Sequence, residues 1–343
     1  MDNNNKRTSR NRYKKKKHKK IWIIFTIFIV LALVAASIGG YTFMELNKIQ
    51  TENISKSPED LGIDKETEQM IDQQDPNNDV INIALFGLDR RSKDEGSRSD
   101  ALMIASIDKK SKKIKLSSIM RDTYVAVPGH GNRKITEAYA FGGAQTTIKT
   151  LNQNFKLNIK DYVAVDFFGL EKIIDALGGV TIDVKQSEIK YINGYMSEVA
   201  GIEGSKIKPV TKAGSQSLNG MQAVAYSRIR YVGNDYERTA RQRRVLTAML
   251  NKIQSAGLTK YPSIVTKMLP YVETSISKGS MLSIGTEVLT SGTKTIDQER
   301  FPVDGYLKGT TINGASVIQA DMPATIDQLH KYIFEDIKPQ PKK

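Results

Sequence analysis

Residues 80–89 read Val-Ile-Asn-Ile-Ala-Leu-Phe-Gly-Leu-Asp, and they give the first indication of the fold class. A β-branched, apolar run that ends in Gly and Asp is typical of a buried strand, which we predict at 80–88. Further strands are predicted at 101–107, 114–119, 162–167, 180–184 and 226–232. Helices are predicted at 135–141 and 145–154, separated by Gly142-Gly143, and at 169–177 and 235–255. Because strands alternate with helices, the sequence predicts an α/β layered domain.

The segments on both sides of this pattern differ in composition. Residues 45–79 are polar and contain Ser57-Pro58 and Asp75-Pro76, which is typical of a linker or stalk before a domain at 80–256. Within the domain, residues 185–220 read as irregular. Residues 257–338 either complete the same domain or form a small accessory module.

Basic charge is concentrated at the N-terminus. The 343 residues carry a net charge of +14, and residues 1–20 hold ten of the 51 Lys and Arg residues. Residues 21–44 then contain no charged group, and as a helix they would span about 36 Å, enough to cross a bilayer. We therefore predict a cytoplasmic tail at 1–20, a transmembrane helix at 21–44 and an outward-facing remainder, in a single-pass protein of the cell membrane. A signal peptide cleaved near Ala35-Ala36-Ser37 is the alternative, but the apolar stretch is longer than such peptides usually have.

Composition excludes several classes of site. The chain has no cysteine, which excludes disulfides, thiolate metal sites and a cysteine nucleophile. Its three histidines are far apart in sequence, at 18, 130 and 330, which argues against a multi-histidine metal site. The basic tail adjoins the predicted membrane span, so we expect it to contact anionic lipid, and we expect no nucleic-acid partner.

Arginine is unevenly distributed. Six of the 15 arginines lie between positions 226 and 245, a window without lysine. Arg228 and Arg230 would share one face of the predicted strand, and Arg238, Arg241 and Gln242 have helical spacing. Planar guanidinium groups suit phosphate, so we expect a polyanion such as pyrophosphate. The alternative is a salt-bridged helix face, with Glu237 as a partner.

Carboxylates follow or precede the first strands of the domain. Asp89 ends one strand and Asp100 begins the next, so the two can approach each other and suit a hard cation such as Mg²⁺ or Mn²⁺. They could instead cap turns or pair with Arg90 and Arg98. Arg121 and Lys134 are plausible phosphate ligands, unless they are simply surface groups.

These blocks in this order resemble the LytR-CpsA-Psr family of Gram-positive cell-envelope proteins. The resemblance covers the anchor and about residues 80–255. The matching blocks include Phe86-Gly87-Leu88-Asp89, Arg98-Ser99-Asp100, Ser118-Ile119-Met120-Arg121-Asp122, Ala140-Phe141-Gly142-Gly143, Arg228-Ile229-Arg230 and 235–242. Met120 stands where the family usually has proline, and Asn234 is an additional residue.

The resemblance implies a mixed β-sheet flanked by helices, with an apolar tunnel for a lipid. It implies a transferase that moves an anionic glycopolymer, such as wall teichoic acid or capsule, with one phosphate, from a polyprenyl-pyrophosphate carrier to peptidoglycan. The acceptor would be the C6 hydroxyl of N-acetylmuramic acid. By position, Asp89 and Asp100 would hold the metal, and the pyrophosphate would be bound by Arg98, Arg121, Arg228, Arg230, Arg238 and Gln242.

The general base is left open between Asp122 and Asp235, because each adjoins an arginine expected to bind phosphate. Three other functions compete with the transferase. They are a polyprenyl-pyrophosphate pyrophosphatase, a membrane-bound transcription attenuator or regulator, and an envelope scaffold without activity. No helix-turn-helix stands out, which argues against the regulator.

Overall fold

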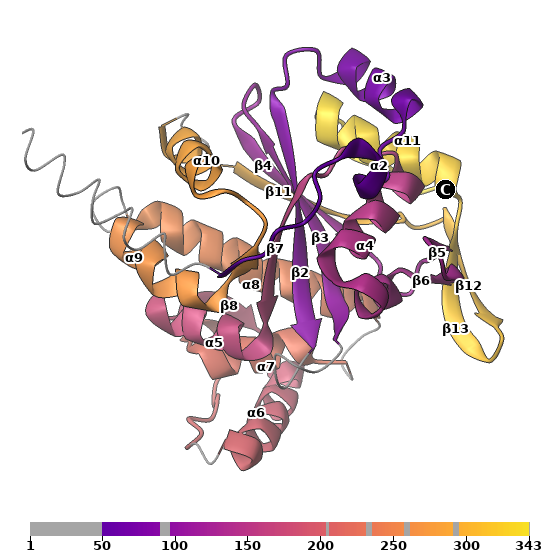
Figure 1. Ribbon diagram of the computed structural model, residues 1–343. Coiled ribbons are helices and arrows are strands. Elements are labelled where there is room, and N and C mark those ends of the chain that lie inside the picture. Colours follow the sequence, from indigo (N-terminus) through magenta and orange to yellow (C-terminus); the bar gives the residue numbers. More distant parts are fainter. Residues whose placement is uncertain are drawn as a thin grey trace, which may run out of the picture. The chain divides into compact units, whose positions relative to one another are not determined.

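A seven-stranded mixed sheet forms the centre of the computed structural model (Figure 1), which describes residues 50–89, 97–203, 206–230, 235–256, 261–290 and 295–342. In spatial order its strands are β1 (Gln50–Thr51), β10 (Glu273–Thr274), β7 (Asp161–Asp166), β2 (Val80–Asp89), β3 (Arg98–Asp108), β4 (Lys113–Ile119) and β11 (Thr295–Phe301). The strands predicted at 80–88, 101–107, 114–119 and 162–167 are therefore confirmed, as is the mixed sheet flanked by helices.

The order of the central strands follows from the lengths of their connections. β3 and β4 pair antiparallel across a charged turn at 109–112, and β2 pairs antiparallel with β3. β7 lies parallel to β2, because the chain first crosses one face of the sheet as a helix. At the far edge, β11 runs parallel to β4, and the N–H of Met120 donates to the carbonyl of Phe301 over 2.9 Å. Proline has no N–H, so Met120 adds a hydrogen bond that a proline here could not make.

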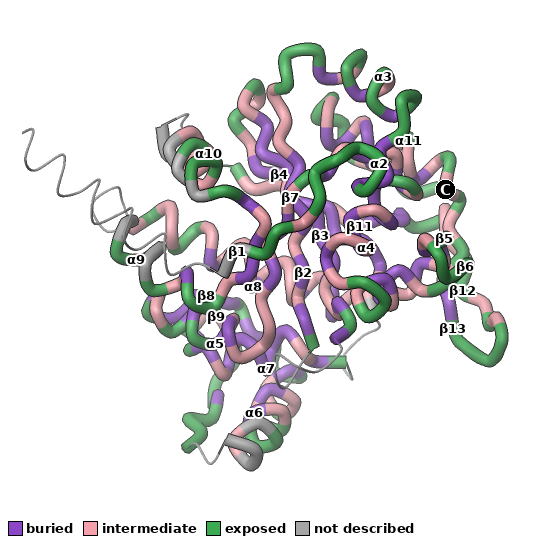
Figure 2. Tube along the Cα trace, viewed as in Figure 1, coloured by how far each residue is buried: buried purple, intermediate pink, exposed green. Residues whose placement is uncertain are grey.

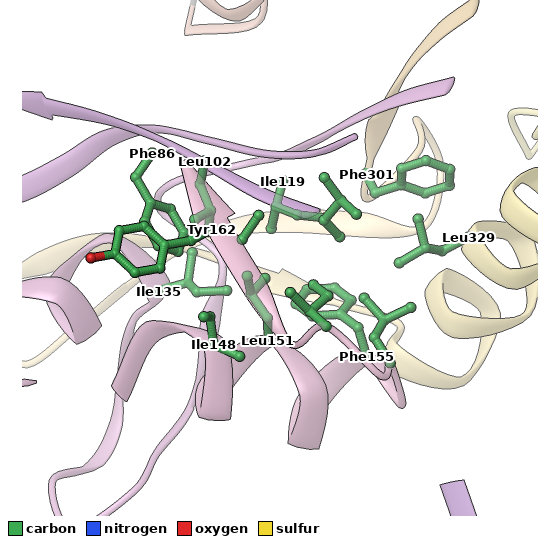
Figure 3. Close-up of a cluster of buried hydrophobic side chains, with 14 of the residues drawn as sticks. Phe86, Leu102, Ile119, Ile135, Ile148, Leu151, Phe155, Tyr162, Phe301 and Leu329 are labelled. Carbon is green, nitrogen blue, oxygen red and sulfur yellow. The ribbon is translucent and has the colours of Figure 1, made fainter. Parts of the chain in front are cut away.

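One face of the sheet is covered by α2 (Pro58–Leu61), α4 (Ala138–Phe155) and α11 (Met322–Glu335). Between them lies a core in which Leu151 and Phe155 are fully buried (Figure 3). The rings of Phe86 and Tyr162 stack within it at 5.7 Å. Burying a large apolar side chain stabilises a fold by about 1.5–3 kcal/mol, so this core fixes β2 against α4. Buried residues follow the central strands and the inner sides of these helices (Figure 2).

The opposite face and the C-terminal end of β2 are covered by a second set of elements. They are α5 (Phe167–Ala176), the antiparallel pair β8 (Val180–Val184) and β9 (Gly214–Leu218), α6 (Ile189–Glu203), α7 (Gly220–Arg228), α8 (Asp235–Ser255), α9 (Tyr261–Met268) and α10 (Lys278–Thr290). The helices predicted at 169–177 and 235–255 correspond to α5 and α8. Figure 1 shows α6 and α7 beyond the C-terminal end of β2.

Two short hairpins lie outside the central sheet, and α4 is kinked. The hairpins are β5 (Tyr124–Val127) with β6 (Gly131–Lys134), and β12 (Leu307–Ile312) with β13 (Ala315–Ala320). The break predicted at Gly142-Gly143 is confirmed as non-helical backbone inside α4. Gly143 has φ +60°, a conformation that glycine adopts without steric cost.

The strand predicted at 226–232 is wrong. Residues up to Arg228 belong to α7, which starts from Asn219 through a capping box with Gln222. The side chains of Asn219 and Gln222 each accept from the other residue's backbone N–H, and this fixes the start of the helix. The strand prediction at 226–232 did not take this helix start into account. The interpretation of 185–220 as irregular is also wrong, since this stretch contains α6 and β9.

The expected linker at 45–79 is not a free stalk in its described part. It contains α2 and α3 (Lys65–Gln74), and Leu61 and Ile71 are buried. Asn152 of α4 donates its side-chain N–H to the carbonyl of Leu61 over 2.8 Å. This packing extends the folded part upstream of Val80. The chain beyond residue 257 contributes β10 and β11 to the central sheet, which favours the first of the two alternatives for this segment.

The predicted tail at 1–20 and transmembrane helix at 21–44 lie outside the described residues. Within the part of the chain that the structure describes, no helix combines the length and hydropathy needed to span a bilayer.

Candidate functional site

One end of the sheet collects most of the residues that the sequence predicts to form the site. β2, β4 and β7 run in the same direction, so their C-terminal ends lie together, at Asp89, before Arg121 and before Phe167. β3 runs the opposite way and begins at this end with Arg98. Ligands of open α/β sheets usually bind at this end, and the prediction that Asp89 and Asp100 occur there is confirmed.

A β-bulge presents Asp100 to this end. Gly87 pairs with Ala101 and Leu88 pairs with Ser99, so Asp100 is the extra residue in β3. Such bulges redirect a side chain next to a site. A Cβ on Gly87 would lie 2.8 Å from the Cβ of Ala101, so this glycine permits the close strand approach beside the bulge.

A polar pocket of about 230 Å³ opens at this position. It combines strand ends of the sheet with residues of α5, α6, α7 and α8 and of the segment after α7. Its lining residues are Asp89, Asp100, Phe167, Tyr195, Glu198, Arg228, Arg230, Arg238 and Gln242.

Asp100 lies at the centre of the charged groups. Its Oδ1 accepts from Arg121 Nη1 over 2.9 Å, and its Oδ2 accepts from Arg230 Nη2 over 3.0 Å. Only 11% of its side chain is exposed, whereas 53% of the Arg230 side chain is exposed. Asp100 therefore orients two arginines from distant parts of the sequence, and charge-assisted bonds of this kind are the stronger ones.

Arg228 is held by aromatic rings. Its guanidinium carbon lies 5.0 Å from the ring centre of Phe167 and 5.4 Å from that of Tyr195. Cation–π contacts within about 6 Å are attractive. These contacts orient Arg228. Because ring faces are weak hydrogen-bond acceptors, the contacts leave the N–H groups of Arg228 able to donate to a ligand.

An apolar cavity of about 240 Å³ adjoins the polar pocket, and the two share Phe167 and Gln242 as walls. Leu85, Met103 and Val163 of the sheet line one side of the cavity. The other side is a stripe of α8, formed by Gln242, Val245, Leu246, Met249, Leu250 and Ile253. With Arg238 one turn earlier, a single face of α8 changes from cationic in the pocket to apolar in the cavity.

Six of the residues predicted as ligands lie together in the polar pocket: Asp89, Asp100, Arg228, Arg230, Arg238 and Gln242. Arg121 joins them through Asp100. Arg98 is exposed and pairs with Asp89 across the strands, but it is not part of the pocket lining.

The prediction that Arg241 binds pyrophosphate is wrong. Its spacing with Arg238 predicted a pyrophosphate ligand, but its side chain is only 1% exposed. Its Nε donates to Glu188 Oε1 over 2.8 Å, and its Nη1 donates to the carbonyl of Ile229. The guanidinium therefore forms an ion pair with Glu188, which lies between β8 and α6, and does not line the pocket.

Lys134 and Asp122 contact each other over 2.9 Å and are absent from the pocket lining. Asp122 also lies 3.7 Å from Arg121, so both predicted residues border the site through Arg121. The side chain of Asp235, the other candidate base, lies outside the described residues. The alternative of a salt-bridged helix face holds for Arg244, whose Nη2 lies 3.7 Å from Glu237.

Sequence reasoning missed Phe167, Tyr195 and Glu198. Tyr195 and Glu198 belong to α6, in the stretch interpreted as irregular. The helical spacing of Ile189, Ile192 and Met196 was the available signal, and these side chains pack into the second core. Tyr195 and Glu198 are three residues apart and so share the helix side that faces the pocket.

Within the described residues, no group of three or more His, Cys, Asp and Glu side chains is arranged to hold a metal ion. The two carboxylates Asp89 and Asp100 are thus the relevant donor set in the pocket. Mg²⁺ commonly uses one or two protein carboxylates, with water and substrate phosphates as its other ligands.

Comparisons with known proteins show which family the chain belongs to. Residues 42–332 match the family described as "LytR_cpsA_psr family". The chain is 31% identical over 268 residues to polyisoprenyl-teichoic acid–peptidoglycan teichoic acid transferase TagT of Bacillus subtilis, covering 76% of this chain and 79% of that protein. It is 30% identical over 265 residues to regulatory protein MsrR of Staphylococcus aureus, covering 76% of each. The solved structure "TagT bound to LI-WTA" is similar with a TM-score of 0.59 and 27% identity, covering 76% of this chain and 92% of that one. The chain belongs to the LytR-CpsA-Psr family.

Proposed function

We propose that the protein is a transferase that moves an anionic glycopolymer, with one phosphate, from a polyprenyl-pyrophosphate carrier to peptidoglycan. One observation carries this proposal: a pocket rich in arginine shares two walls with an apolar cavity. A donor with a pyrophosphate joined to a hydrocarbon chain has the same division of chemistry. The relatives TagT and MsrR differ in their names, and the pocket favours the transferase of the two.

The polar half fits the pyrophosphate. Arg228, Arg230 and Arg238 come from two helices and the segment between them, so they can surround a diphosphate from several directions. Guanidinium groups bind phosphate oxygens in a planar, bidentate way. The pocket also lies beside the start of α8, where backbone N–H groups favour anions.

The apolar half fits the polyprenyl chain. Val245, Leu246 and Met249 present hydrocarbon surface along successive turns of α8. Burial of apolar surface contributes about 25 cal/mol per Å², so even the first isoprene units add substantial affinity. Gln242, at the junction, is in a position to bond the phosphate nearest to the lipid.

Asp89 and Asp100 are proposed to hold Mg²⁺ or Mn²⁺. Asp89 is exposed in the pocket. Among the described residues, each Asp100 oxygen accepts from one arginine, so a further lone pair remains on each. When bound, such a cation neutralises phosphate charge.

The residues of the chain then act by positioning and charge stabilisation, which dominate phosphoryl transfer. Arg228 and Arg230 would hold the phosphate attached to the glycan and stabilise the charge that develops on its oxygens. Arg121, fixed by Asp100, would support the same group. The acceptor is proposed to be the C6 hydroxyl of N-acetylmuramic acid.

The proposed location is the outer surface of the cell membrane, with the N-terminus in the cytoplasm. Support for this topology comes from the uncharged stretch at 21–44 after the basic tail. A membrane-bound donor would meet the pocket there.

The test mixes the full chain in detergent with a synthetic polyprenyl-pyrophosphate saccharide, Mg²⁺ and uncrosslinked peptidoglycan, and identifies products by mass spectrometry. Saccharide joined to peptidoglycan through one phosphate is the expected product. Arg228→Ala should lower its yield about 100- to 1000-fold, as expected for loss of a group that stabilises the transition state.

Arg133→Ala is the matched control, because Arg133 is an exposed arginine of β6 that does not line the pocket. Release of phosphosaccharide at the same rate without peptidoglycan would identify a pyrophosphatase instead. Absence of turnover with any donor would remove the transferase and leave a regulatory or scaffold role.

A further inference from the structure

Glu198 is a carboxylate in a pocket that otherwise attracts anions. It belongs to α6 and lines the polar pocket with Arg228, Arg230 and Arg238. Among the described residues it makes no hydrogen bond or ion pair, even to these arginines. Asp100, in contrast, is neutralised by two arginines. Glu198 is therefore an acceptor that the rest of the described protein leaves unused.

Two other roles open to an acid in this pocket do not fit Glu198. Asp89, Asp100 and Glu198 do not form a three-carboxylate group that could hold a metal ion. A negative charge beside the phosphates opposes donor binding by Coulomb repulsion. Any favourable contact of Glu198 with substrate has to be with a hydrogen-bond donor, and a hydroxyl is the donor that this reaction brings into the pocket.

The placement of Glu198 suits contact with the acceptor hydroxyl. Phe167 and Gln242 connect the pocket to the apolar cavity, so the lipid-bearing leaving group is on their side. In-line displacement requires the acceptor to approach from the opposite side. Glu198 is exposed and lines only the polar pocket, so it lies where an acceptor can enter from solvent.

We propose that Glu198 is the general base of the transfer reaction, an inference that rests on the proposed function. Its carboxylate takes the proton of the peptidoglycan hydroxyl as that oxygen bonds to the phosphorus attached to the glycan. The bond from this phosphorus to the bridging oxygen breaks, and its electron pair leaves with polyprenyl phosphate. Glu198 thus replaces Asp122, which contacts Lys134 and does not line the pocket.

The decisive variants are Glu198→Gln, which preserves shape, and Glu198→Ala, which makes room for an added carboxylate. In the full chain, Glu198→Gln should lower kcat about 100- to 10,000-fold, the usual contribution of a general base. The dissociation constant for the donor, measured without acceptor by calorimetry, should stay constant or fall, because a repulsive charge is gone. Formate should restore transfer by Glu198→Ala at least about tenfold.

Asp183→Asn is the matched control, since Asp183 is an exposed acid of the neighbouring β8 that does not line the pocket. It should keep wild-type kcat and show no response to formate. Structural damage to α6 would instead weaken donor binding in both Glu198 variants and abolish formate rescue, and that result would overturn the assignment.

Wild-type kcat in Glu198→Gln would also overturn it, while the transferase itself would stand. Absence of transfer by the wild-type chain is a different result, because it removes the proposed function and the base together.

Discussion

Arg241 and Glu188 form an ion pair of 2.8 Å in which the side chains are 1% and 0% exposed. Arg241 lies on α8, and Glu188 lies immediately before α6, 53 positions earlier in the sequence. The pair therefore joins the helix that carries Arg238 and Gln242 to the helix that carries Tyr195 and Glu198.

Replacement of one partner should cost stability and leave the ligand site intact. We expect Arg241→Ala to lower the free energy of unfolding by about 3–5 kcal/mol, because Glu188 is left as a buried charge without its cation. Urea denaturation of the full chain in detergent measures this. The double variant Arg241→Met/Glu188→Met should recover most of the loss. Unchanged stability with weakened pyrophosphate binding would instead support the ligand role predicted from sequence.

A bulky residue in the apolar cavity should act on the lipid alone. Leu246→Trp fills part of the cavity from α8. The dissociation constant for a long-chain polyprenyl pyrophosphate should therefore rise about tenfold or more, which is a loss of at least about 1.4 kcal/mol of binding free energy. Binding of inorganic pyrophosphate should not change. Calorimetry measures both. Asn251→Trp, on the exposed side of the same helix, is the control, and an equal effect there would rule out the cavity as the lipid site.

The aromatic contacts of Arg228 make lysine a poor substitute. Arg228→Lys keeps the charge but loses the planar group that lies against Phe167 and Tyr195. We expect kcat/KM for transfer to fall about 100-fold. Arg133→Lys should have no effect. Wild-type kinetics in Arg228→Lys would mean that charge alone matters at this position.

Buried His330 should make stability depend on pH. Burial lowers the pKa of His330 from its ordinary 6.5, against the opposing effect of the Phe155 carbonyl, 2.9 Å from Nε2. The unfolded chain then binds a proton near pH 6.5 that the folded chain does not, so stability falls as the pH drops from about 7.5 to 5.5.

The slope for this single group is at most about 1.4 kcal/mol per pH unit. His330→Gln, which cannot titrate, should flatten the dependence of Tm on pH across this window. A parallel dependence in wild type and variant would show that other groups cause it.

The positions of Asp89 and Asp100 were predictable from the local sequence, because they depend on where two strands end and begin. Asp89 ends β2 and Asp100 lies near the start of β3, and the apolar runs that predict these two adjacent strands are enough to bring the two ends together. The Gly142-Gly143 break and α8 were predictable for the same reason, because backbone freedom and helical spacing are local properties.

Two parts of the site depended on contacts that local patterns do not contain. Arg238 and Arg241 have equivalent spacing in the sequence, and only the position of Glu188 directs one of them away from the pocket. A strand is predicted at 226–232, but the capping box at Asn219 starts a helix that continues to Arg228. Tyr195 and Glu198 were missed because α6 was not recognised.

The pairing of β11 with β4 also has a consequence for how a newly made chain matures. The ribosome has added every described pocket residue once it reaches Gln242, but the strand partner of β4 is complete only at Phe301, roughly 60 residues later. Until then β4, which leads directly to Arg121, has an open edge, and contacts between such distant segments form slowly. A nascent chain therefore carries every described side chain of the polar pocket well before the strand beside Arg121 is secured, and we expect competence for binding to come late in synthesis.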